Sequence, residues 1–68
     1  MFALIESIGS PEFYTGKTYI YHGAYYPTVS YCKEEAKLYK SEKVALNSCN
    51  KLNSKIESGH IFKVIKIN

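Results

Sequence analysis

Tyrosines are concentrated in one short stretch of this 68-residue chain. The segment GKTYIYHGAYYPTVSY, residues 16–31, holds five of the seven: Tyr19, Tyr21, Tyr25, Tyr26 and Tyr31. Tyrosine buries a large area with few rotatable bonds and keeps a hydroxyl for hydrogen bonding, so it is enriched at binding hot spots. It is also a common strand residue. The tyrosines could therefore serve in packing or form a binding surface, although this many tyrosines are more than one small core can bury.

Lysine supplies all of the positive charge, and most of it lies in the C-terminal half. The net charge is +3, with one lysine and two glutamates in residues 1–32 and eight lysines and four glutamates in residues 33–68. Lys37, Lys40 and Lys43 are candidates for attracting an acidic partner, because surface charge acts mainly on association rates. The alternative is a solvated lysine face without a partner.

A nucleic-acid interface is a second use of the same residues. Bases would stack on the tyrosines while lysines follow the phosphates. Against this use, the tyrosines and most lysines lie in different halves of the chain, and arginine is absent. Nucleic-acid binding is therefore kept as an alternative.

Residues that usually carry catalysis or hold metals are sparse. The soft metal ligands are His22, Cys32, Cys49 and His60, and none forms the close pair with which small domains hold zinc. There is no aspartate, and Glu6, which lies in an apolar stretch, is expected on an exposed face. We therefore expect no catalytic residue, no cofactor and no metal, and we expect Cys49 to be a small buried hydrophobe.

Length and composition indicate one domain covering residues 1–68. A chain this short leaves much of its surface exposed, so a deep catalytic cleft is not expected. The N-terminal residues lack the features of a secretory signal, and no stretch approaches the roughly 20 apolar residues that span a bilayer. We expect a cytoplasmic protein with reduced thiols and no membrane partner.

Alternating apolar and polar residues predict the strands that would carry the tyrosines. We expect a first strand at residues 2–8, a loop at 9–16, and strands at 17–22 and 25–32 joined in a hairpin around Gly23-Ala24. Pro27 lacks a donor for a ladder, so its strand should be an edge or should begin after a bulge. Alternation places Tyr19 and Tyr21 on one face, opposite to Ile20.

After residue 40 the spacing of the apolar residues changes from the alternation of a strand to the three- and four-residue spacing of a helix. Ser41 occupies the N-cap position, and Glu42 complements the helix dipole. The apolar stripe is formed by Ala45, Cys49, Leu52 and Ile56, widened by Val44. Ser58-Gly59 is the expected stop. Residues 60–67 then form a last strand, which is apolar on both sides and is therefore expected inside the sheet.

The order β-β-β-α-β predicts an α+β domain with a small, mainly antiparallel four-stranded sheet and one helix packed on one face. One helix covers only one face of a sheet. If Ile20 points towards the helix, Tyr19 and Tyr21 face solvent or a partner.

The C-terminal half resembles a pattern found in small proteins of bacteriophages and other mobile elements. The segment EEAKLYKSEKVALNSCNKL, residues 34–52, and the strand FKVIKI that follows carry the resemblance at Ala36, Lys37, Tyr39, Ser41, Ala45 and Leu52. Several phage-encoded anti-CRISPR proteins are similar in build, with one helix on an antiparallel sheet. The resemblance implies stoichiometric binding to a host protein or ribonucleoprotein complex in the host cytoplasm, and it assigns no contact residue.

The sequence favours a small non-enzymatic binding protein that inhibits or modulates a host complex. The expected partner-binding residues are Tyr19, Tyr21, Tyr25, Tyr26, Tyr31, Lys37, Lys40 and Lys43. The alternatives are a nucleic-acid-binding module and a structural or oligomerising subunit, in which the strand containing Pro27 pairs with its copy. Monomer and homodimer both stay open.

Overall fold

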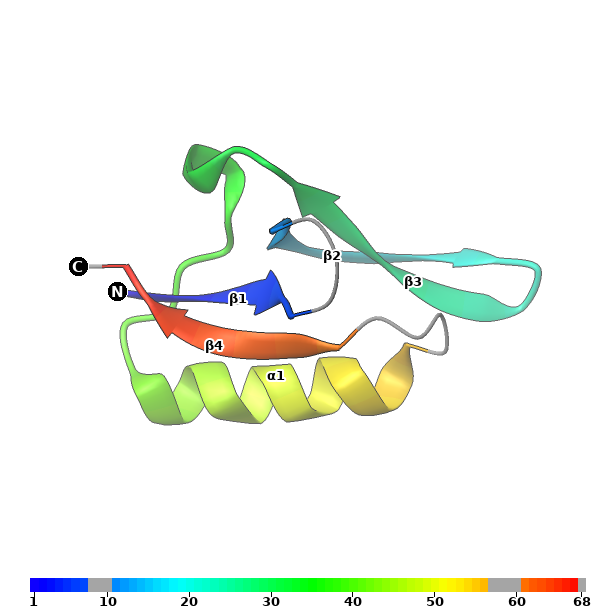
Figure 1. Cartoon of the computed structure of the whole chain (residues 1–68). Helices are drawn as coiled ribbons and strands as arrows, with labels where there is room; N and C mark the ends of the chain where they lie inside the picture. The colour runs from blue at the N-terminus through cyan, green and yellow to red at the C-terminus, as the bar shows by residue number, and fades with distance from the viewer. Residues whose placement is uncertain (8–10, 57–60, 68) are drawn as a thin grey trace.

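The computed structural model, which describes residues 1–7, 11–56 and 61–67, is one sheet with one long helix. Its elements are β1 (Phe2–Glu6), β2 (Phe13–Tyr21), β3 (Ala24–Ser30), the short 3-10 helix η1 (Lys33–Glu35), α1 (Glu42–Lys55) and β4 (Phe62–Lys66). The four strands form an antiparallel sheet in the order β3-β2-β1-β4 (Figure 1). The predicted order of elements and the α+β class are confirmed.

The helix α1 covers one face of the sheet, where it runs alongside β1 and β4 (Figure 1). The buried cluster comprises Leu4, Tyr39, Ala45, Cys49, Leu52, Ile56 and Phe62. The predicted helical stripe is confirmed except at Val44, whose side chain is 52% exposed. Successive helical residues are turned by roughly 100°, so Val44 points away from the surface that Ala45 contacts.

The last strand, β4, lies at an edge of the sheet, and the expectation of an interior strand was wrong. Within the described residues it pairs with β1 alone, with Ala3 opposite Ile65. The apolar residues on the two sides of β4 contact different parts of the molecule. Phe62 packs in the core against α1, whereas Ile65 is half-buried on the other face beside the fully buried Ala3. Apolar residues on both sides of this strand therefore do not indicate an interior position.

Strand β2 begins at Phe13, inside the segment 9–16 where we expected a loop. It passes through Gly16, whose φ of 99° is rarely adopted by residues with a side chain. The register with β3 shifts between Tyr14 and Thr18, so the strand is irregular around this glycine. The glycine that predicted the end of a loop instead marks a bulge within a longer strand.

A two-residue turn joins β2 to β3. His22 and Gly23 have φ values of 52° and 80°, and Tyr21 lies opposite Ala24. Positive φ at both turn residues matches the twist of the flanking strands. The predicted hairpin is confirmed, and Pro27 lies in an edge strand, as expected.

Several boundaries differ from the predicted ones by a few residues. The first strand ends at Glu6, the third at Ser30 and the helix at Lys55. The predicted helix stop, Ser58-Gly59, and the first residue of the predicted last strand, His60, lie outside the described residues.

Two polar residues near element ends differ from expectation. Ser41 holds the N-cap position of α1, but its side chain makes no cap hydrogen bond. Glu6 lies directly opposite Phe62 and therefore shares the helix-side face of the sheet, where it is half-buried. The expectation that Glu6 is exposed was wrong, because the alternation of β1 that buries Leu4 also turns Glu6 inward.

The segment between η1 and α1 lies beside both β1 and β2. Tyr39 and Phe2 exchange two backbone hydrogen bonds of 2.8 Å, and the Lys37 N–H donates to the Tyr14 carbonyl at 2.9 Å. These bonds satisfy backbone groups that the sheet leaves unpaired. They also fix the positions of Lys37 and Tyr39 relative to β2.

The hairpin formed by β2 and β3 projects past the C-terminal end of α1 (Figure 1). The molecule accordingly extends 37 Å along its long axis and only 22 and 19 Å along the others. The outer part of the hairpin therefore lies beyond the reach of the helix.

Candidate functional site

Three tyrosines, the exposed Tyr19 and Tyr21 and the half-buried Tyr26, form an aromatic surface on the hairpin, which we name the tyrosine face. Tyr19 of β2 lies directly opposite Tyr26 of β3, and their rings stack with centroids 5.6 Å apart. Tyr21 and Tyr26 meet edge to face at 6.4 Å. Tyr19 is 53% exposed and Tyr21 is 59% exposed. The ring contacts restrict these side chains before a partner binds, which lowers the entropy lost on binding.

Tyr25 shows which way the tyrosine face points. Its ring packs against the core cluster, and Lys55 Nζ from α1 lies 4.5 Å from the ring centroid. Adjacent strand residues point to opposite faces, so Tyr26 and its partner Tyr19 lie on the face without the helix. The predicted orientation of Tyr19 and Tyr21 is confirmed.

Ile20 has the opposite orientation but is not covered by the helix. It lies across from Tyr25 and is 62% exposed, because the hairpin projects past α1 (Figure 1). The outer hairpin thus presents an aliphatic side chain on one side and the tyrosine face on the other.

The hairpin also carries very little charge. Residues 13–30 contain one lysine, Lys17, and no carboxylate. The ring of His22, at the turn, contacts Tyr21 with centroids 4.1 Å apart and extends the aromatic surface. Because the centres of interfaces are depleted in charged residues, this composition suits a surface that loses its water on binding.

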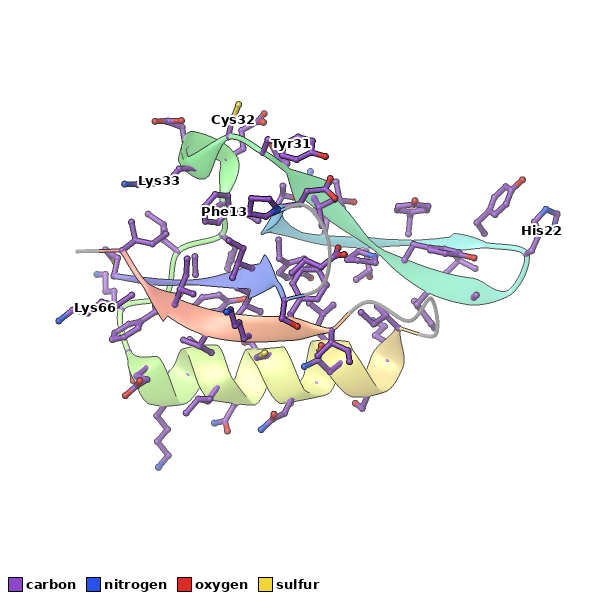
Figure 2. The ribbon with its side chains drawn as sticks, in the orientation of Figure 1. Phe13, His22, Tyr31, Cys32, Lys33 and Lys66 are labelled. Atoms are coloured by element: carbon purple, nitrogen blue, oxygen red, sulfur yellow. The ribbon has the colours of Figure 1, made fainter. Side chains whose placement is uncertain are left out.

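The structure does not bring all eight predicted binding residues into one surface. Tyr25 lies on the helix side of the hairpin. Tyr31 is exposed beyond the end of β3, close to η1 and far from His22 (Figure 2). Lys40 and Lys43 are exposed beside the N-terminal end of α1, the end farther from the hairpin turn (Figure 1). The tyrosine face and these lysines are therefore separate features.

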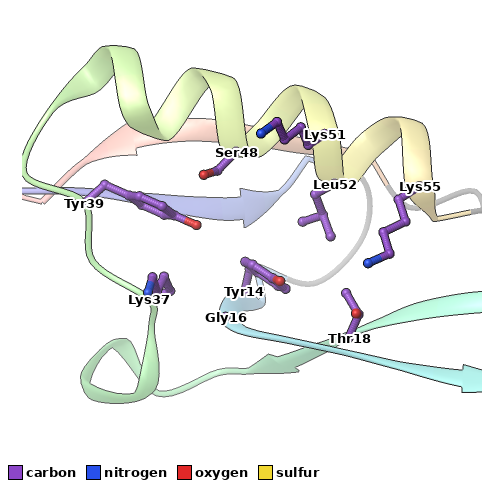
Figure 3. A pocket seen from close by; sticks show the side chains of 9 residues that line it. All are labelled: Tyr14, Gly16, Thr18, Lys37, Tyr39, Ser48, Lys51, Leu52 and Lys55. Carbon is purple, nitrogen blue, oxygen red and sulfur yellow. The ribbon is translucent and has the colours of Figure 1, made fainter.

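Lys37 lies in a pocket of about 330 Å³ between α1 and β2 (Figure 3). We name it the lysine pocket, because Lys37, Lys51 and Lys55 all line it. Lys51 and Lys55 are four residues apart and so lie on one face of the helix. Sequence reasoning missed this pair as a site, since the spacing shows a shared face but not which strand that face meets.

Hydroxyl groups line the same pocket, from Tyr14, Thr18, Tyr39 and Ser48. Burial raises the pKa of Tyr14, and the neighbouring Tyr39 raises it further. Tyr14 therefore keeps its proton at neutral pH and can donate a hydrogen bond. No acidic residue is among the described residues that line the pocket.

Thiols and metal ligands do not assemble into a site within the described part of the chain. Cys49 is buried, its Sγ donates to the Phe62 carbonyl at 3.1 Å, and burial raises the pKa of the thiol. Cys32 is exposed. Among the described residues, no three His, Cys, Asp or Glu side chains come together as metal ligands. The prediction that Cys49 is a buried hydrophobe is confirmed.

Comparison with protein-family models, curated proteins and solved structures gave no match to this chain. Within the described residues, no helix has the length and apolar character needed to cross a membrane. The tyrosine face and the lysine pocket are therefore the features from which a function is inferred.

Proposed function

We propose that the chain is a non-enzymatic binding protein that attaches to a larger protein through the tyrosine face. The observation that carries the proposal is the stack of Tyr19 on Tyr26, with Tyr21 at its edge, on the sheet face opposite α1. Tyrosine is among the commonest hot-spot residues, and rings that are already ordered offer contact area at a small entropic cost. Exposed rings of this kind support a role in recognition.

Such a protein would act by occupancy, covering a surface that its partner needs for its own interactions. The resemblance of residues 34–52 to small phage and mobile-element proteins supports a host protein or ribonucleoprotein complex as the partner, and inhibition as the outcome. A standard interface buries about 800 Å² on each partner. The molecule has 4588 Å² of accessible surface, so an interface of that size would use less than a fifth of it.

The charge distribution favours a protein partner over a nucleic acid. Proteins that bind single strands place stacking aromatic rings and basic side chains in one groove. Here the lysine pocket lies between α1 and β2, whereas the tyrosine face lies on the other side of the sheet. A strand that stacked on the tyrosine face would have to pass around the sheet to reach those lysines.

Co-purification with matched variants tests the proposal. Tagged wild type, a Tyr19→Ser/Tyr21→Ser double variant and a Tyr31→Ser control are each used to capture complexes from bacterial cells that express CRISPR nucleases and surveillance complexes. Tyr31 is a suitable control because it is 65% exposed and lies off the tyrosine face. We expect a stoichiometric partner that wild type and the control retain and that the double variant loses by at least about tenfold in affinity.

If the Tyr19→Ser/Tyr21→Ser variant captured as much of the partner as wild type, the tyrosine face would not be the binding surface. A wild type that captures no stoichiometric partner would count against the binding function itself. Recovery that disappears after nuclease digestion and falls steeply with salt would point to nucleic acid instead. Circular dichroism of each variant checks that a lost partner does not reflect a lost fold.

A further inference from the structure

The lysine pocket gathers three positive charges. Lys37 lines it from the segment that precedes Tyr39, and Lys51 and Lys55 line it from successive turns of α1 (Figure 3). None of the described residues that line it is acidic. Like charges around one space repel each other, and an anion placed between them replaces that repulsion with attraction. The pocket therefore favours an anionic ligand.

The uncharged polar groups of the pocket suit the same kind of ligand. Tyr14 and Tyr39 extend their hydroxyls into the space between α1 and β2, and Thr18 and Ser48 add two further hydroxyls (Figure 3). Hydroxyl and ammonium groups all donate hydrogen bonds. Phosphate oxygens accept several such bonds at once, and bonds to an ionised acceptor are stronger than neutral ones.

Gly16 makes room for one of the lysines. A Cβ built on Gly16 would lie 3.1 Å from Lys37 Cδ, which is closer than ordinary van der Waals contact. The missing side chain lets the Lys37 stem lie directly against β2, and the backbone bond from Lys37 to Tyr14 holds it there. The backbone of Lys37 and the start of its side chain are thus held beside β2 by the fold.

We propose that the lysine pocket binds a small soluble molecule that carries two or more phosphate groups. Its volume of about 330 Å³ lies at the small end of ligand pockets, which span roughly 300–1,000 Å³. A diphosphate or triphosphate carries several negative charges, which three ammonium groups can match. Lysine is a common phosphate-binding residue, and its ammonium group acts as a point charge. Leu52 and the ring of Tyr14 line the pocket beside these charges and provide apolar contact for the rest of the ligand.

This proposal is independent of partner binding by the tyrosine face, because the two sites use different residues on opposite sides of the sheet. The two can therefore fail separately. Loss of the tyrosine face should leave phosphate binding intact, and loss of the pocket lysines should leave the tyrosine face intact.

Titration of the isotope-labelled 68-residue chain with sodium pyrophosphate, followed by NMR at an ionic strength of about 0.15 M, tests the proposal. The ring signals of Tyr25 provide a readout close to the pocket, because Lys55 Nζ lies 4.5 Å from that ring. The variants are Lys51→Gln/Lys55→Gln and, from outside the helix, Lys37→Gln. The control is Lys63→Gln/Lys66→Gln, which removes the same charge as the helix pair from exposed positions in β4.

We expect saturable shifts in wild type, at least about tenfold weaker binding in the Lys51/Lys55 variant, and less than about twofold change in the control. Equal weakening in the control would overturn the proposal, because it would reduce the effect to net charge. Absence of saturable shifts up to about 10 mM pyrophosphate, where even millimolar affinity saturates, would also overturn it. The proposal would also be overturned if a short single-stranded oligonucleotide bound the same lysines far more tightly than pyrophosphate or a nucleoside triphosphate. The preferred ligand would then be a nucleic acid and not a small soluble molecule.

Discussion

The side-chain amide of Asn53 forms two hydrogen bonds with the backbone of Phe62. Oδ1 accepts from the Phe62 N–H at 2.9 Å, and Nδ2 donates to the Phe62 carbonyl at 3.0 Å. The neighbouring Ile61 carbonyl bonds to Ser7, so the backbone of Phe62 faces away from β1, at the outer edge of the sheet. Asn53 therefore takes the place of a neighbouring strand at this position and ties α1 to β4.

Replacing Asn53 with alanine should lower the free energy of unfolding by about 2 kcal/mol, because it leaves the Phe62 N–H without its partner and leaves the Phe62 carbonyl with only the weak thiol donor of Cys49. Urea unfolding followed by circular dichroism measures this change. Asn50→Ala is the matched control, since Asn50 is exposed on the same helix, and it should change stability by less than about 0.5 kcal/mol. Equal losses in the two variants would show that the bonds of Asn53 contribute nothing beyond helix propensity.

The turn of the hairpin depends on a backbone conformation at Gly23. Its φ is 80°, and apart from its two chain neighbours no residue has an atom within 4 Å of a Cβ built there, so a substitution acts through the backbone alone. Gly23→Ala should destabilise the protein by about 1 kcal/mol, whereas Gly23→Asn should cost less, because asparagine tolerates this conformation. Thermal unfolding of the two variants compares them, and an alanine variant as stable as wild type would contradict the assigned turn.

Features with local causes were predictable from the sequence. The stripe from Ala45 to Ile56 follows the helical period, and the alternation around Ile20 gave the orientation of Tyr19 and Tyr21 correctly. Gly23 marked the hairpin because the turn needs positive φ. In each case the residues that carry the pattern are close together in the chain.

Features that depend on distant residues were not predictable. The lysine pocket joins Tyr14, Lys37 and Lys55, which no spacing rule connects. The edge position of β4 depends on which strands pair with β1 on its two sides. Apolar residues on both sides of β4 do not predict that pairing. The exposure of Ile20 likewise depends on where α1 ends relative to the hairpin, which is a property of the assembled layers.

Two leucines of α1 offer a matched test of the core. Leu52 is 5% exposed and belongs to the buried cluster, whereas Leu46 is 48% exposed. Leu52→Ala should lower the free energy of unfolding by about 3 kcal/mol, because it removes buried apolar area and leaves a cavity. Leu46→Ala should change it by less than about 0.5 kcal/mol. Urea unfolding distinguishes them, and similar values for both would mean that α1 packs through another face.

The buried thiol of Cys49 makes stability depend on alkaline pH. Burial raises its pKa above the ordinary value of 9.0, so the native state keeps the thiol proton at a pH where the unfolded chain releases it. The native state then binds more protons, and stability falls as pH rises above about 9, by at most about 1.4 kcal/mol per pH unit for one group. Tyr14, whose pKa is raised from 10.0, adds a loss of the same sign at higher pH.

We therefore expect a Cys32→Ser protein, in which Cys49 is the remaining thiol, to unfold at lower urea concentration at pH 10 than at pH 7. Adding Cys49→Ala should lower stability at both pH values through lost packing, but it should also reduce the fall between them, because the titrating thiol is gone. Urea midpoints of the two proteins across this range provide the measurement. A fall of the same size with and without Cys49 would assign the alkaline loss to Tyr14 and other groups, and would mean that the buried thiol ionises as readily in the native state as in the unfolded chain.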